Sequence, residues 1–450
     1  MHLSIWETSL PFSYSMASEK KQAKKGVPQS VKGMRDIMDE EYYQMQGLFE
    51  KAQEIAMYYG FHPIDTPILE DEEIFSKGGA SEGTDLDKEM YRLTTKGRDK
   101  LALRAEGTAP VMRAYVEHGM KSRPQPVMLY YSGPIFRHDK PQRGRYRQHH
   151  QFGMEVLGTE KPIADAIIIQ ATMKILQEAG AKDLVVEINS IGDKESRKDY
   201  ERALKAYYRK HMNSLPDIDR QRVKDNVLRV LDSKDPKTIE INEEAPDSIS
   251  FLTNPAKKHF KAVLEYLNEL EIPYRINKSL VRGLDYYTDT VFEVVEEIED
   301  DKGNKRSLSI CGGGRYNYLS KTLGHRREVP GVGVGIGMER VMQSDWWNNL
   351  TPRIVRKPKI YFIQLGFEAK LKSLHIVEQL RKAKIATMQS LSKDKLSSQL
   401  AAAEKTGAPY VMIFGQREAL DGTVIIRDMK DHKQKTIKSE DLVAYIKKLK

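Results

Sequence analysis

Cysteine is nearly absent from this sequence of 450 residues, and long apolar runs are absent altogether. The single cysteine, Cys311, has no partner for an intrachain disulfide, and the spacing of cysteine and histidine residues suggests no metal site built from protein ligands. No apolar run approaches the roughly 18 to 20 residues that cross a bilayer. The sequence therefore excludes a disulfide-stabilised secreted domain and an integral membrane protein, and it favours a reducing compartment such as the cytoplasm.

Lysine and arginine are missing from Met1 to Ser15, which argues against a basic transit peptide and against a secretory signal. Met16 could serve as an alternative start, so a second, mitochondrial pool stays open. The first 32 residues show no apolar periodicity and include a lysine-rich run after Glu19. We expect residues 1–31 to form a flexible basic tail.

The formal net charge of +9 is concentrated near the C-terminal end of the sequence. Residues 353–450 contain 21 Lys and Arg against 10 Asp and Glu, a net charge of +11, so residues 1–352 carry a net charge of −2. A basic surface of this kind attracts polyanions, and nucleic acid is the commonest specific partner. On charge alone, a lysine-rich solubilising surface explains the excess equally well.

Apolar periodicity predicts an amphipathic helix with an N-cap at Asp36 and a glycine stop at Gly60. The next segment, 61–69, has the pattern of a strand, but its two prolines suit an edge or interface position. Further strand-like segments occur at 127–131, 150–157, 184–190, 281–295 and 332–338. Because few long helices separate them, we expect an α+β fold with a mostly antiparallel sheet and helices packed on one side.

Two other regions differ from this pattern. Residues 193–270 are charged and compatible with helices, which predicts a helical insertion. From Pro358 on, strand-like and helical segments alternate, with strands near 360–365, 385–388, 410–414 and 423–426 and a last helix from Ser439. This alternation predicts a small, separate α/β domain over residues 357–450 with some parallel strand pairing.

The most informative segment runs from Ser132 to Gly158, where two strand-like ends flank a polar loop. The basic residues of this segment are Arg137, Lys140, Arg143, Arg145 and Arg147. Arginine donates two parallel hydrogen bonds to phosphate oxygens, so a strand–loop–strand could hold a phosphate at Arg137 while its loop reaches a bound nucleic acid. For an anonymous basic loop, the alternative is an exposed hairpin without a ligand.

This segment resembles motif 2 of the class II aminoacyl-tRNA synthetases, in the bacterial-type histidyl form. Residues 32–36 (Lys-Gly-Met-Arg-Asp) are similar to the family's opening signature, residues 60–67 to motif 1, and residues 331–340 to motif 3. Two more blocks are typical of the histidine enzyme: Arg-Gly-Leu-Asp-Tyr-Tyr-Thr at 282–288 and Cys-Gly-Gly-Gly-Arg-Tyr at 311–316.

The resemblance implies the antiparallel-sheet catalytic core of class II synthetases over residues 32–352, with the helical insertion inside it. It also implies that the C-terminal α/β domain binds the anticodon. The activity implied is an ATP-dependent ligase, which activates L-histidine as an adenylate and transfers it to the 3′ end of tRNA(His). The partners would then be ATP, L-histidine and tRNA(His).

Adenylate formation joins the histidine carboxylate to the α-phosphorus of ATP. The carboxylate is itself the nucleophile, so catalysis should depend on positioning and on positive charge rather than on a protein base. The resemblance implies that Arg137 and Arg282 hold the α-phosphate and that Arg340 contacts the γ-phosphate and adenine, with Mg²⁺ bridging other phosphate oxygens. The other ATP-binding residues it implies are Arg145, Tyr146, His149 and Glu339.

Histidine requires an anionic partner for its ammonium group and hydrogen-bond partners for both ring nitrogens. By the resemblance, Glu106, Thr108 and Gln151 bind the ammonium end, while Glu155 and Tyr287 contact the ring. The remaining histidine-binding residues it implies are Gly107, Arg137, Arg282 and Tyr286. Without the neighbouring arginine, the two tyrosines would be read as ordinary strand packing.

Two positions depart from the family pattern. Ala105 stands where the family commonly has proline, and His149 stands where a phenylalanine often lies against adenine. An imidazole ring can also stack on a base.

Glycines alternate with apolar residues from Gly331 to Gly337, and a period of two predicts a strand. One face of this strand would lack side chains, which would let adenosine lie flat on the backbone or would allow a tight helix–sheet contact. Residues 312–314, three glycines in a row, would either allow close approach near the histidine or form a turn.

A synthetase-like relative that has lost catalysis is the alternative class, either as a tRNA sensor or as a regulatory subunit of ATP phosphoribosyltransferase. Such relatives lose parts of the arginine and histidine-site set or the anticodon domain, whereas this chain keeps them. We therefore favour the active ligase. Because motif 1 builds the subunit interface in this family, we also expect a homodimer.

Overall fold

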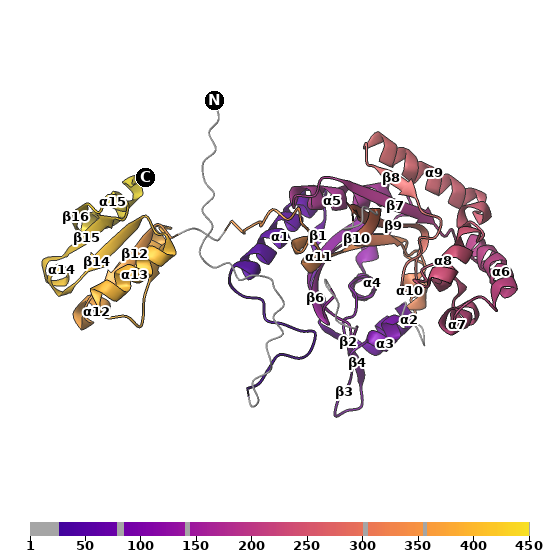
Figure 1. Cartoon of the computed structure of the whole chain (residues 1–450), viewed down its shortest axis with the longest axis horizontal. Helices are drawn as coiled ribbons and strands as arrows, with labels where there is room; N and C mark the ends of the chain where they lie inside the picture. Colours follow the sequence, from indigo (N-terminus) through magenta and orange to yellow (C-terminus); the bar gives the residue numbers. More distant parts are fainter. Residues whose placement is uncertain (1–26, 79–84, 140–144, 300–304, 354–357, 450) are drawn as a thin grey trace. The chain divides into compact units, whose positions relative to one another are not determined.

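The structure, a computed structural model, describes residues 27–78, 85–139, 145–299, 305–353 and 358–449. The chain forms two compact units, one over residues 28–352 and one from residue 353 onward, and each is described by itself (Figure 1). The tail expected over residues 1–31 and the alternative start at Met16 lie largely outside the described residues, as do Lys140 and Arg143. Of the tail, only residues 27–31 are described, and they are exposed.

An eight-stranded sheet forms the centre of the larger unit, in the order β1-β5-β6-β11-β10-β9-β7-β8. Its strands are β1 (His62–Pro63), β5 (Val127–Phe136), β6 (Gln148–Leu157), β7 (Leu184–Ser190), β8 (Tyr274–Ile276), β9 (Thr288–Glu299), β10 (Lys305–Arg315) and β11 (Gly331–Gly337). Only the two edge pairs, β1 with β5 and β7 with β8, are parallel. The predicted antiparallel sheet is therefore confirmed.

Three local predictions are corrected by the structure. The segment 61–69 supplies an edge strand as expected, but only His62 and Pro63 pair with β5, because proline cannot donate to a strand ladder, and Leu69 instead begins a strand of a second sheet. Residues 281–287 are not strand, and pairing begins at Thr288. The helix predicted from Asp36 begins instead at Asp39, after Met38, where three acidic residues favour a helix N-terminus.

Helices cover the two faces of the central sheet unequally. The long helices α1 (Asp39–Tyr58), α5 (Ile163–Glu178) and α9 (Asn254–Glu269) contribute to one apolar core with β6, β7, β9 and β11. Side chains alternate along β6, so Phe152 and Met154 enter this core while Gln151 and Glu155 face the other way. The shorter α4 (Thr108–Glu117) packs on that opposite face, so the expectation of helices on one side alone is incomplete (Figure 1).

Smaller elements complete the larger unit around this sheet. A three-stranded sheet has the order β2-β4-β3, and the short helix α2 contacts β2 and β4. These elements are β2 (Leu69–Asp71), α2 (Glu72–Gly78), α3 (Asp85–Glu89), β3 (Arg92–Thr94), β4 (Lys100–Leu103), η1 (Met120–Ser122), α10 (Leu319–Thr322) and α11 (Met338–Met342).

The predicted insertion is helical in the structure. It contains α6 (Lys194–His211), α7 (Asp217–Asp225), η2 (Val227–Val230), α8 (Pro236–Glu243), η3 (Ser248–Phe251) and then α9. Tyr200, Leu204, Tyr208 and Leu215 form part of a separate small core between these helices. The last helix of the insertion, α9, packs against α5 and β9, so it is also one of the helices that cover the central sheet.

The C-terminal unit is an α/β domain with a five-stranded sheet in the order β13-β12-β14-β15-β16. Its elements are β12 (Ile360–Gln364), α12 (Phe367–Lys382), β13 (Thr387–Gln389), α13 (Leu396–Thr406), β14 (Tyr410–Phe414), α14 (Gln416–Asp421), β15 (Thr423–Asp428), β16 (Gln434–Lys438), η4 (Ser439–Asp441) and α15 (Leu442–Lys448). Parallel pairing of β12 with β13 and β14 confirms the prediction. Two elements, α14 and β16, were not predicted. Strand β16 has a single buried residue, Ile437, and so it lacks the apolar alternation that predicts a strand.

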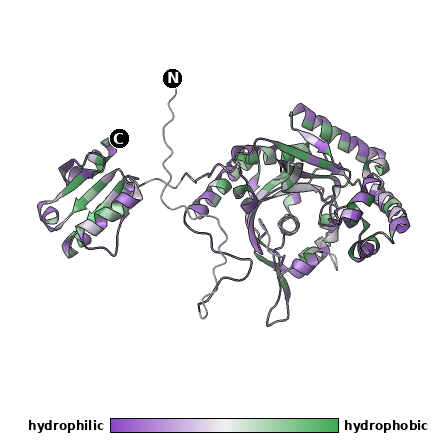
Figure 2. Ribbon diagram, viewed as in Figure 1, coloured by the Kyte–Doolittle hydropathy of each residue, from purple (hydrophilic) through white to green (hydrophobic). Residues whose placement is uncertain are grey.

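Hydrophobic residues run along the strands inside each unit, and hydrophilic residues dominate the outer surfaces of α6 and α7 (Figure 2). None of the helices in the described ranges combines the length and the apolar character needed to span a membrane.

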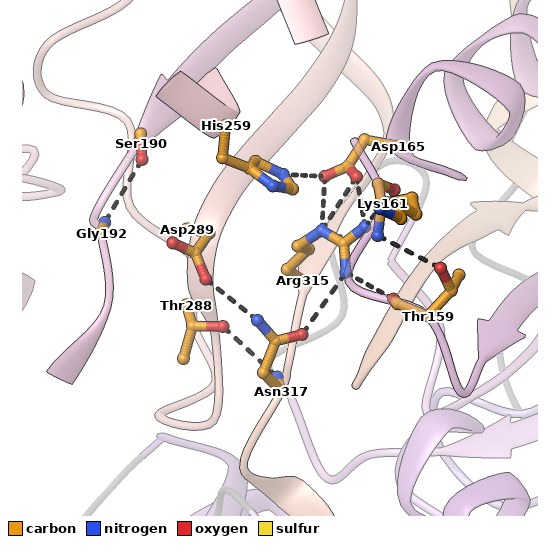
Figure 3. Close-up of polar contacts among 10 residues, drawn as sticks. All are labelled: Thr159, Lys161, Asp165, Ser190, Gly192, His259, Thr288, Asp289, Arg315 and Asn317. Atoms are coloured by element: carbon orange, nitrogen blue, oxygen red, sulfur yellow. Dashed lines mark hydrogen bonds and ion pairs between the residues drawn. The ribbon is translucent and has the colours of Figure 1, made fainter. Parts of the chain in front are cut away.

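A fully buried ion pair joins the end of β10 to α5 (Figure 3). Nε and Nη2 of Arg315 donate to the carboxylate of Asp165 at 2.6–3.0 Å, and both side chains are 0% exposed. The other donors of Arg315 bind the carbonyls of Thr159 at 3.0 Å and Lys161 at 2.8 Å. Nε2 of His259, from α9, lies 3.5 Å from the same carboxylate. This cluster therefore fastens β10, α5 and α9 together.

Burial alone would raise the pKa of Asp165, but Arg315 and His259 outweigh it and hold that pKa below its usual value. The carboxylate is thus ionised in the folded chain. We expect Arg315→Met to lower the free energy of unfolding by about 3–5 kcal/mol, because it leaves this carboxylate buried without its main partner. Urea denaturation of the full chain measures the change.

Two further variants make this test specific. The double variant Arg315→Met, Asp165→Leu should recover part of the loss, because no unpaired charge remains in the core. Arg202→Met, on the exposed surface of α6, removes an arginine of a surface pair and should change stability little. A double variant that is less stable than the single one would contradict the argument.

Candidate active site

Polar side chains gather on the face of the central sheet opposite α1 and α5. They come from four parts of the chain that are distant in sequence: the start of α4, strand β6, the residues just before β9, and the end of β10. The sequence-predicted residues that meet here are Glu106, Thr108, Gln151, Glu155, Tyr286 and Tyr287. The alternation of β6 explains the meeting, since every second residue of that strand points to this face.

Glu155 is fully buried in the middle of this group. Its carboxylate accepts hydrogen bonds from the Tyr316 hydroxyl at 2.5 Å and the Thr108 hydroxyl at 2.8 Å. Burial raises the pKa of Glu155 to about 8, against the lowering effect of these two donors, and the nearby Glu106 raises it further. A carboxyl group of this kind can exchange a proton near neutral pH.

Glu106 lies at the N-terminus of α4 and is buried as well. Its two carboxylate oxygens accept from the backbone amides of Thr108 and Ala109, each at 2.7 Å. The Tyr286 hydroxyl donates to the same carboxylate at 3.3 Å. Burial raises the pKa of Glu106, while the two amides and Arg137 act in the opposite direction. The carboxylate is therefore fixed in place and faces the site from the helix end.

Gln151 supplies a second oxygen on the same side. Its Oε1 is buried and has no hydrogen-bond partner among the residues that the structure describes. A buried acceptor without a donor is costly, so this oxygen is suited to a ligand that brings an N–H group. Gly107 contributes no side chain, and a Cβ there would lie 2.1 Å from the Tyr131 ring, so this glycine makes room for a tyrosine under the site.

The glycine face of β11 is filled by neighbouring side chains. A Cβ at Gly333 would lie 1.6 Å from the Glu155 carboxylate, and one at Gly335 would lie 1.9 Å from the Gln151 amide. Neither an adenosine lying flat along these residues nor a tight helix contact matches this arrangement. The glycines instead allow two side chains of the adjacent strand to fold across the sheet.

The glycines of β10 leave space for the side chain of Arg282, which precedes β9. A Cβ at Gly312 would lie 2.4 Å from Nη1 of Arg282, so the run of glycines is a strand that allows close approach and does not form a turn. The Arg282 guanidinium pairs with Glu293 of β9 and lies 5.8 Å from the centre of the Tyr287 ring. Arg282 therefore borders both the tyrosine pair and the arginine cluster described next.

Three arginines crowd one end of the site. Nη1 of Arg340, from α11, donates to the Ser309 carbonyl at 2.8 Å. Burial lowers the pKa of Arg340, and the positive charges of Arg145 and Arg282 lower it further. Mutual repulsion of this kind is relieved by an anion, so this end of the site is electrostatically prepared for phosphate.

Arg137 lies at the end of β5, between this end and the carboxylates. Its Nε donates to the Ala105 carbonyl at 2.7 Å. Its charge acts on the pKa values of both Glu106 and His149, which places it near the two halves of the site. Alanine at 105 keeps the backbone carbonyl that holds this arginine.

The remaining predicted residues lie beside the arginine end. Burial lowers the pKa of His149 to about 4, and Arg137 adds to the effect, so this ring is neutral and can stack. Tyr146 lies between Arg35, whose guanidinium carbon is 4.9 Å from its ring centre, and Gln343, which donates to its hydroxyl at 2.9 Å.

Glu339 is directed toward the backbone of β6. Its carboxylate accepts from the His150 backbone amide at 2.9 and 3.0 Å and contacts the His150 ring at 2.8 Å. The structure therefore brings the predicted ATP-binding residues together but engages Glu339 in holding β6.

Tyr316, Tyr131 and Arg35 contact residues of the site, although no role was predicted for them. Tyr316 and Arg35 lie inside blocks that carry the resemblance, so their position in these blocks was a usable signal. Tyr131 lies in an ordinary apolar strand pattern and carried none. The site thus has buried acceptors at one end and crowded guanidinium groups at the other.

The chain matches two family models in sequence order. A model described as "Histidyl-tRNA synthetase" matches residues 33–341, and a model described as "Anticodon binding domain" matches residues 359–449. The first match contains the whole candidate site, and the second contains the C-terminal sheet.

Individual relatives agree with these matches. A histidine--tRNA ligase from Dehalococcoides mccartyi is 39% identical over 421 residues, which are 93% of this chain and 99% of the relative. The crystal structure of apo histidyl-tRNA synthetase from S. aureus is 30% identical with a TM-score of 0.76, and the match covers 94% of this chain and 100% of that one. A Bacillus halodurans structure described as an ATP phosphoribosyltransferase regulatory subunit/histidyl-tRNA synthetase is 21% identical with a TM-score of 0.58, over 82% of this chain and 95% of that one, and shows the fold alone.

The raised pKa of Glu155 predicts a pH-dependent stability. The pKa is about 8 in the folded chain against an ordinary value of 4.5. The contribution of Glu155 to the free energy of unfolding is therefore fully present below pH 4.5 and is lost as the pH rises through 8. Relative to Glu155→Gln, which cannot ionise, the wild type should lose roughly 4 kcal/mol between about pH 5 and about pH 9.

Denaturant unfolding of both proteins across this pH range measures the difference. The exposed Glu160→Gln controls for the same change of chemical group at the surface. A wild-type minus Glu155→Gln difference that stays constant with pH would mean that Glu155 is ionised throughout.

Proposed function

This chain belongs to the histidyl-tRNA synthetase family, and on that premise we propose that it activates L-histidine with ATP and transfers the histidyl group to the 3′ end of tRNA(His). The observation that carries the proposal is the polarity of the site. Buried oxygen acceptors at Glu106, Gln151 and Glu155 lie at one end, and the arginines lie at the other. Histidyl-adenylate has the matching order of groups, with a cationic ammonium and ring N–H at one end and phosphate at the other.

The acceptor end would bind the amino acid. Glu106 supplies the negative charge for the ammonium group, and Gln151 Oε1 accepts one of its protons. Glu155 reads the imidazole, because each of its oxygens has a second lone pair beyond those used by Tyr316 and Thr108. An analogue without a ring N–H would leave Glu155 with an unmet partner, and this supports selectivity for histidine.

The guanidinium end would stabilise the reacting phosphates. The histidine carboxylate attacks the α-phosphorus, the bond to the bridging oxygen breaks, and pyrophosphate leaves with the electron pair. Arg137 and Arg282 would hold the α-phosphate and Arg340 the γ-phosphate, so positive charge stands where negative charge accumulates. No side chain has to remove a proton in this step. His149, which is neutral, would stack on adenine.

Mg²⁺ would accompany ATP, since it bridges phosphate oxygens and neutralises their charge. In the described part of the chain, no group of three or more His, Cys, Asp or Glu residues is placed to hold a metal ion by itself. The residues present therefore fit an ion carried mainly by the phosphates. Among the side chains of the protein, Glu293, whose carboxylate lies beside Arg282, would supply an oxygen ligand to this ion.

The remaining parts of the chain would serve the RNA. We assign the catalytic domain to residues 32–352, with the insertion at 193–270, and the anticodon-binding domain to residues 357–450, whose net charge of +9 (19 Lys and Arg against 10 Asp and Glu) suits a polyanion. The insertion would contact another arm of the tRNA, and residues 1–31 would form a basic tail. Cys311 is buried, and burial raises its pKa to about 12, which suits a reduced cytoplasmic protein.

The alternative of a catalytically inactive sensor or regulatory subunit has less support. The full-length relatives are ligases by name, and the regulatory relative shares only the fold. The complete set of arginines and buried acceptors favours catalysis.

ATP–pyrophosphate exchange tests the proposal directly. We expect the purified chain to catalyse exchange with histidine and with no other amino acid when Mg²⁺ is present. Arg282→Ala should retain the fold and lose at least about 100-fold in exchange rate, because a guanidinium on the α-phosphate is removed. The exposed Arg326→Ala is the matched control and should retain the wild-type rate. A folded wild-type chain without exchange would favour the inactive alternative.

A homodimer is the expected assembly. The short strand β1 leaves its edge unpaired by the rest of the sheet, and beside it an open cup of about 370 Å³ is lined by Asp65, Thr66, Pro67 and Arg104, among others. A second copy would cover this surface. Sedimentation equilibrium at micromolar concentration should give about 103 kDa, twice the 51.6 kDa of one chain. A stable mass of one chain would contradict the dimer.

A further inference from the structure

The loop of residues 281–287, between β8 and β9, carries three residues of the candidate site: Arg282, Tyr286 and Tyr287. This loop has no regular structure of its own. Its backbone carbonyls therefore depend on hydrogen bonds from elsewhere, and the structure shows that the helical insertion supplies them.

Three insertion residues donate to this loop. Nη1 of Arg197, from α6, donates to the carbonyls of Asp285 at 2.9 Å and Tyr287 at 3.3 Å. Nη2 of Arg229, from η2, donates to the Gly283 carbonyl at 3.0 Å. Nδ2 of Asn226, between α7 and η2, donates to the Asp285 carboxylate at 2.7 Å.

Two of these donors, Arg197 and Asn226, are themselves held by hydrogen bonds within the insertion. Nε of Arg197 donates to Glu201 one helical turn along α6 at 2.8 Å. Oδ1 of Asn226 accepts from the Leu228 backbone amide at 3.2 Å, as the cap of η2. The insertion therefore presents a preorganised set of donors to the loop.

Apolar contacts bind the same loop on both sides. Val281 packs against the separate core of the insertion, whereas Leu284 packs against two cores of the catalytic part. The loop is thus held between the insertion and the sheet, and a shift of the insertion would move it.

We infer that Arg197, Asn226 and Arg229 are positioning residues, through which the helical insertion holds Arg282, Tyr286 and Tyr287 in place for histidine activation even without RNA. The inference rests on the proposed function for the site, but it adds a role for the insertion in amino-acid activation itself. A displacement of about 1 Å at reacting groups can cost about 100-fold in rate, so a support of this kind has a measurable effect.

The same residues could instead be ordinary cationic contacts to RNA phosphates. Their burial argues against this, since the side chains of Arg197 and Arg229 are only 24% and 15% exposed, against 71% for Arg202 of the same insertion. Their guanidinium groups are used by the loop. An RNA contact would affect transfer to tRNA and leave exchange without RNA unchanged.

A swap of the Asn226–Asp285 pair provides the sharpest test. Asn226→Asp keeps the cap on Leu228 but places a second carboxylate against Asp285, and we expect kcat/KM for histidine in ATP–pyrophosphate exchange to fall roughly 10- to 100-fold. The double variant Asn226→Asp, Asp285→Asn restores a donor–acceptor pair with reversed polarity and should recover to within about threefold of the wild type. Arg202→Gln is the matched control and should leave exchange unchanged.

The inference is overturned if Asn226→Asp alone stays within about threefold of the wild type, or if the double variant is no better than the single one. Hydrogen–deuterium exchange of the unliganded proteins gives a readout that needs no activity. In Asn226→Asp and in Arg229→Gln, amides 281–288 should lose protection while those of α6 keep it, and unchanged protection of the loop would also overturn the inference.

The two readouts separate this inference from the proposed function. If the wild type shows no exchange with histidine, the proposed function fails, while the protection of the loop still tests the support by the insertion. If the wild type is active and only the loop result is negative, the function stands and the positioning role falls.

Discussion

The buried pair of Arg315 and Asp165 is the constraint on which the site geometry depends. It fixes the last residue of β10 against α5, and the next residue, Tyr316, donates its hydroxyl to Glu155. A displacement of Arg315 at the end of β10 would therefore move the adjacent Tyr316 and, through its hydrogen bond, the carboxyl group of Glu155. A buried ion pair contributes little net stability compared with apolar packing, so its value here lies in fixing one arrangement of strand and helix.

The site has unfavourable electrostatics of opposite sign at its two ends. At one end, burial raises the pKa values of Glu106 and Glu155, which means that negative charge there is unfavourable without a cationic partner. At the other end, burial and then the neighbouring cations Arg145 and Arg282 lower the pKa of Arg340, which means that positive charge there is unfavourable without an anion. A ligand with an ammonium at one end and phosphates at the other relieves both stresses at once, so affinity and orientation have the same physical origin.

Strongly periodic parts of the fold were predictable from the sequence, and parts set by tertiary contacts were not. The glycine alternation at 331–337 predicted β11, and the edge position of β1 followed from its prolines. Asp36 was a plausible cap, but the segment before α1 is fixed by distant contacts, since Gly33 accepts from the Arg147 amide.

The candidate site shows the same division between local and distant information. The residues named from motifs converge, because motifs preserve chemistry that acts at one place. The use of the β11 glycines was misjudged, since the side chains that fill their face, Glu155 and Gln151, come from another strand. The supports of the site at Asn226 and Arg229 had no local signal at all, because their partners lie more than fifty residues along the chain.

This separation in sequence bears on how the insertion and the site influence each other. The loop 281–287 is held by both the insertion and the central sheet. A ligand that binds to either part can therefore shift the loop between its possible positions. Thermodynamic linkage makes such an influence reciprocal for binding. If RNA at the insertion steadies the loop, histidine at the site must strengthen RNA binding by the same factor. The three donors of the insertion are then the physical route for that coupling, because they bond to Gly283 and Asp285 in the loop that carries Arg282, Tyr286 and Tyr287, the residues proposed to bind histidine.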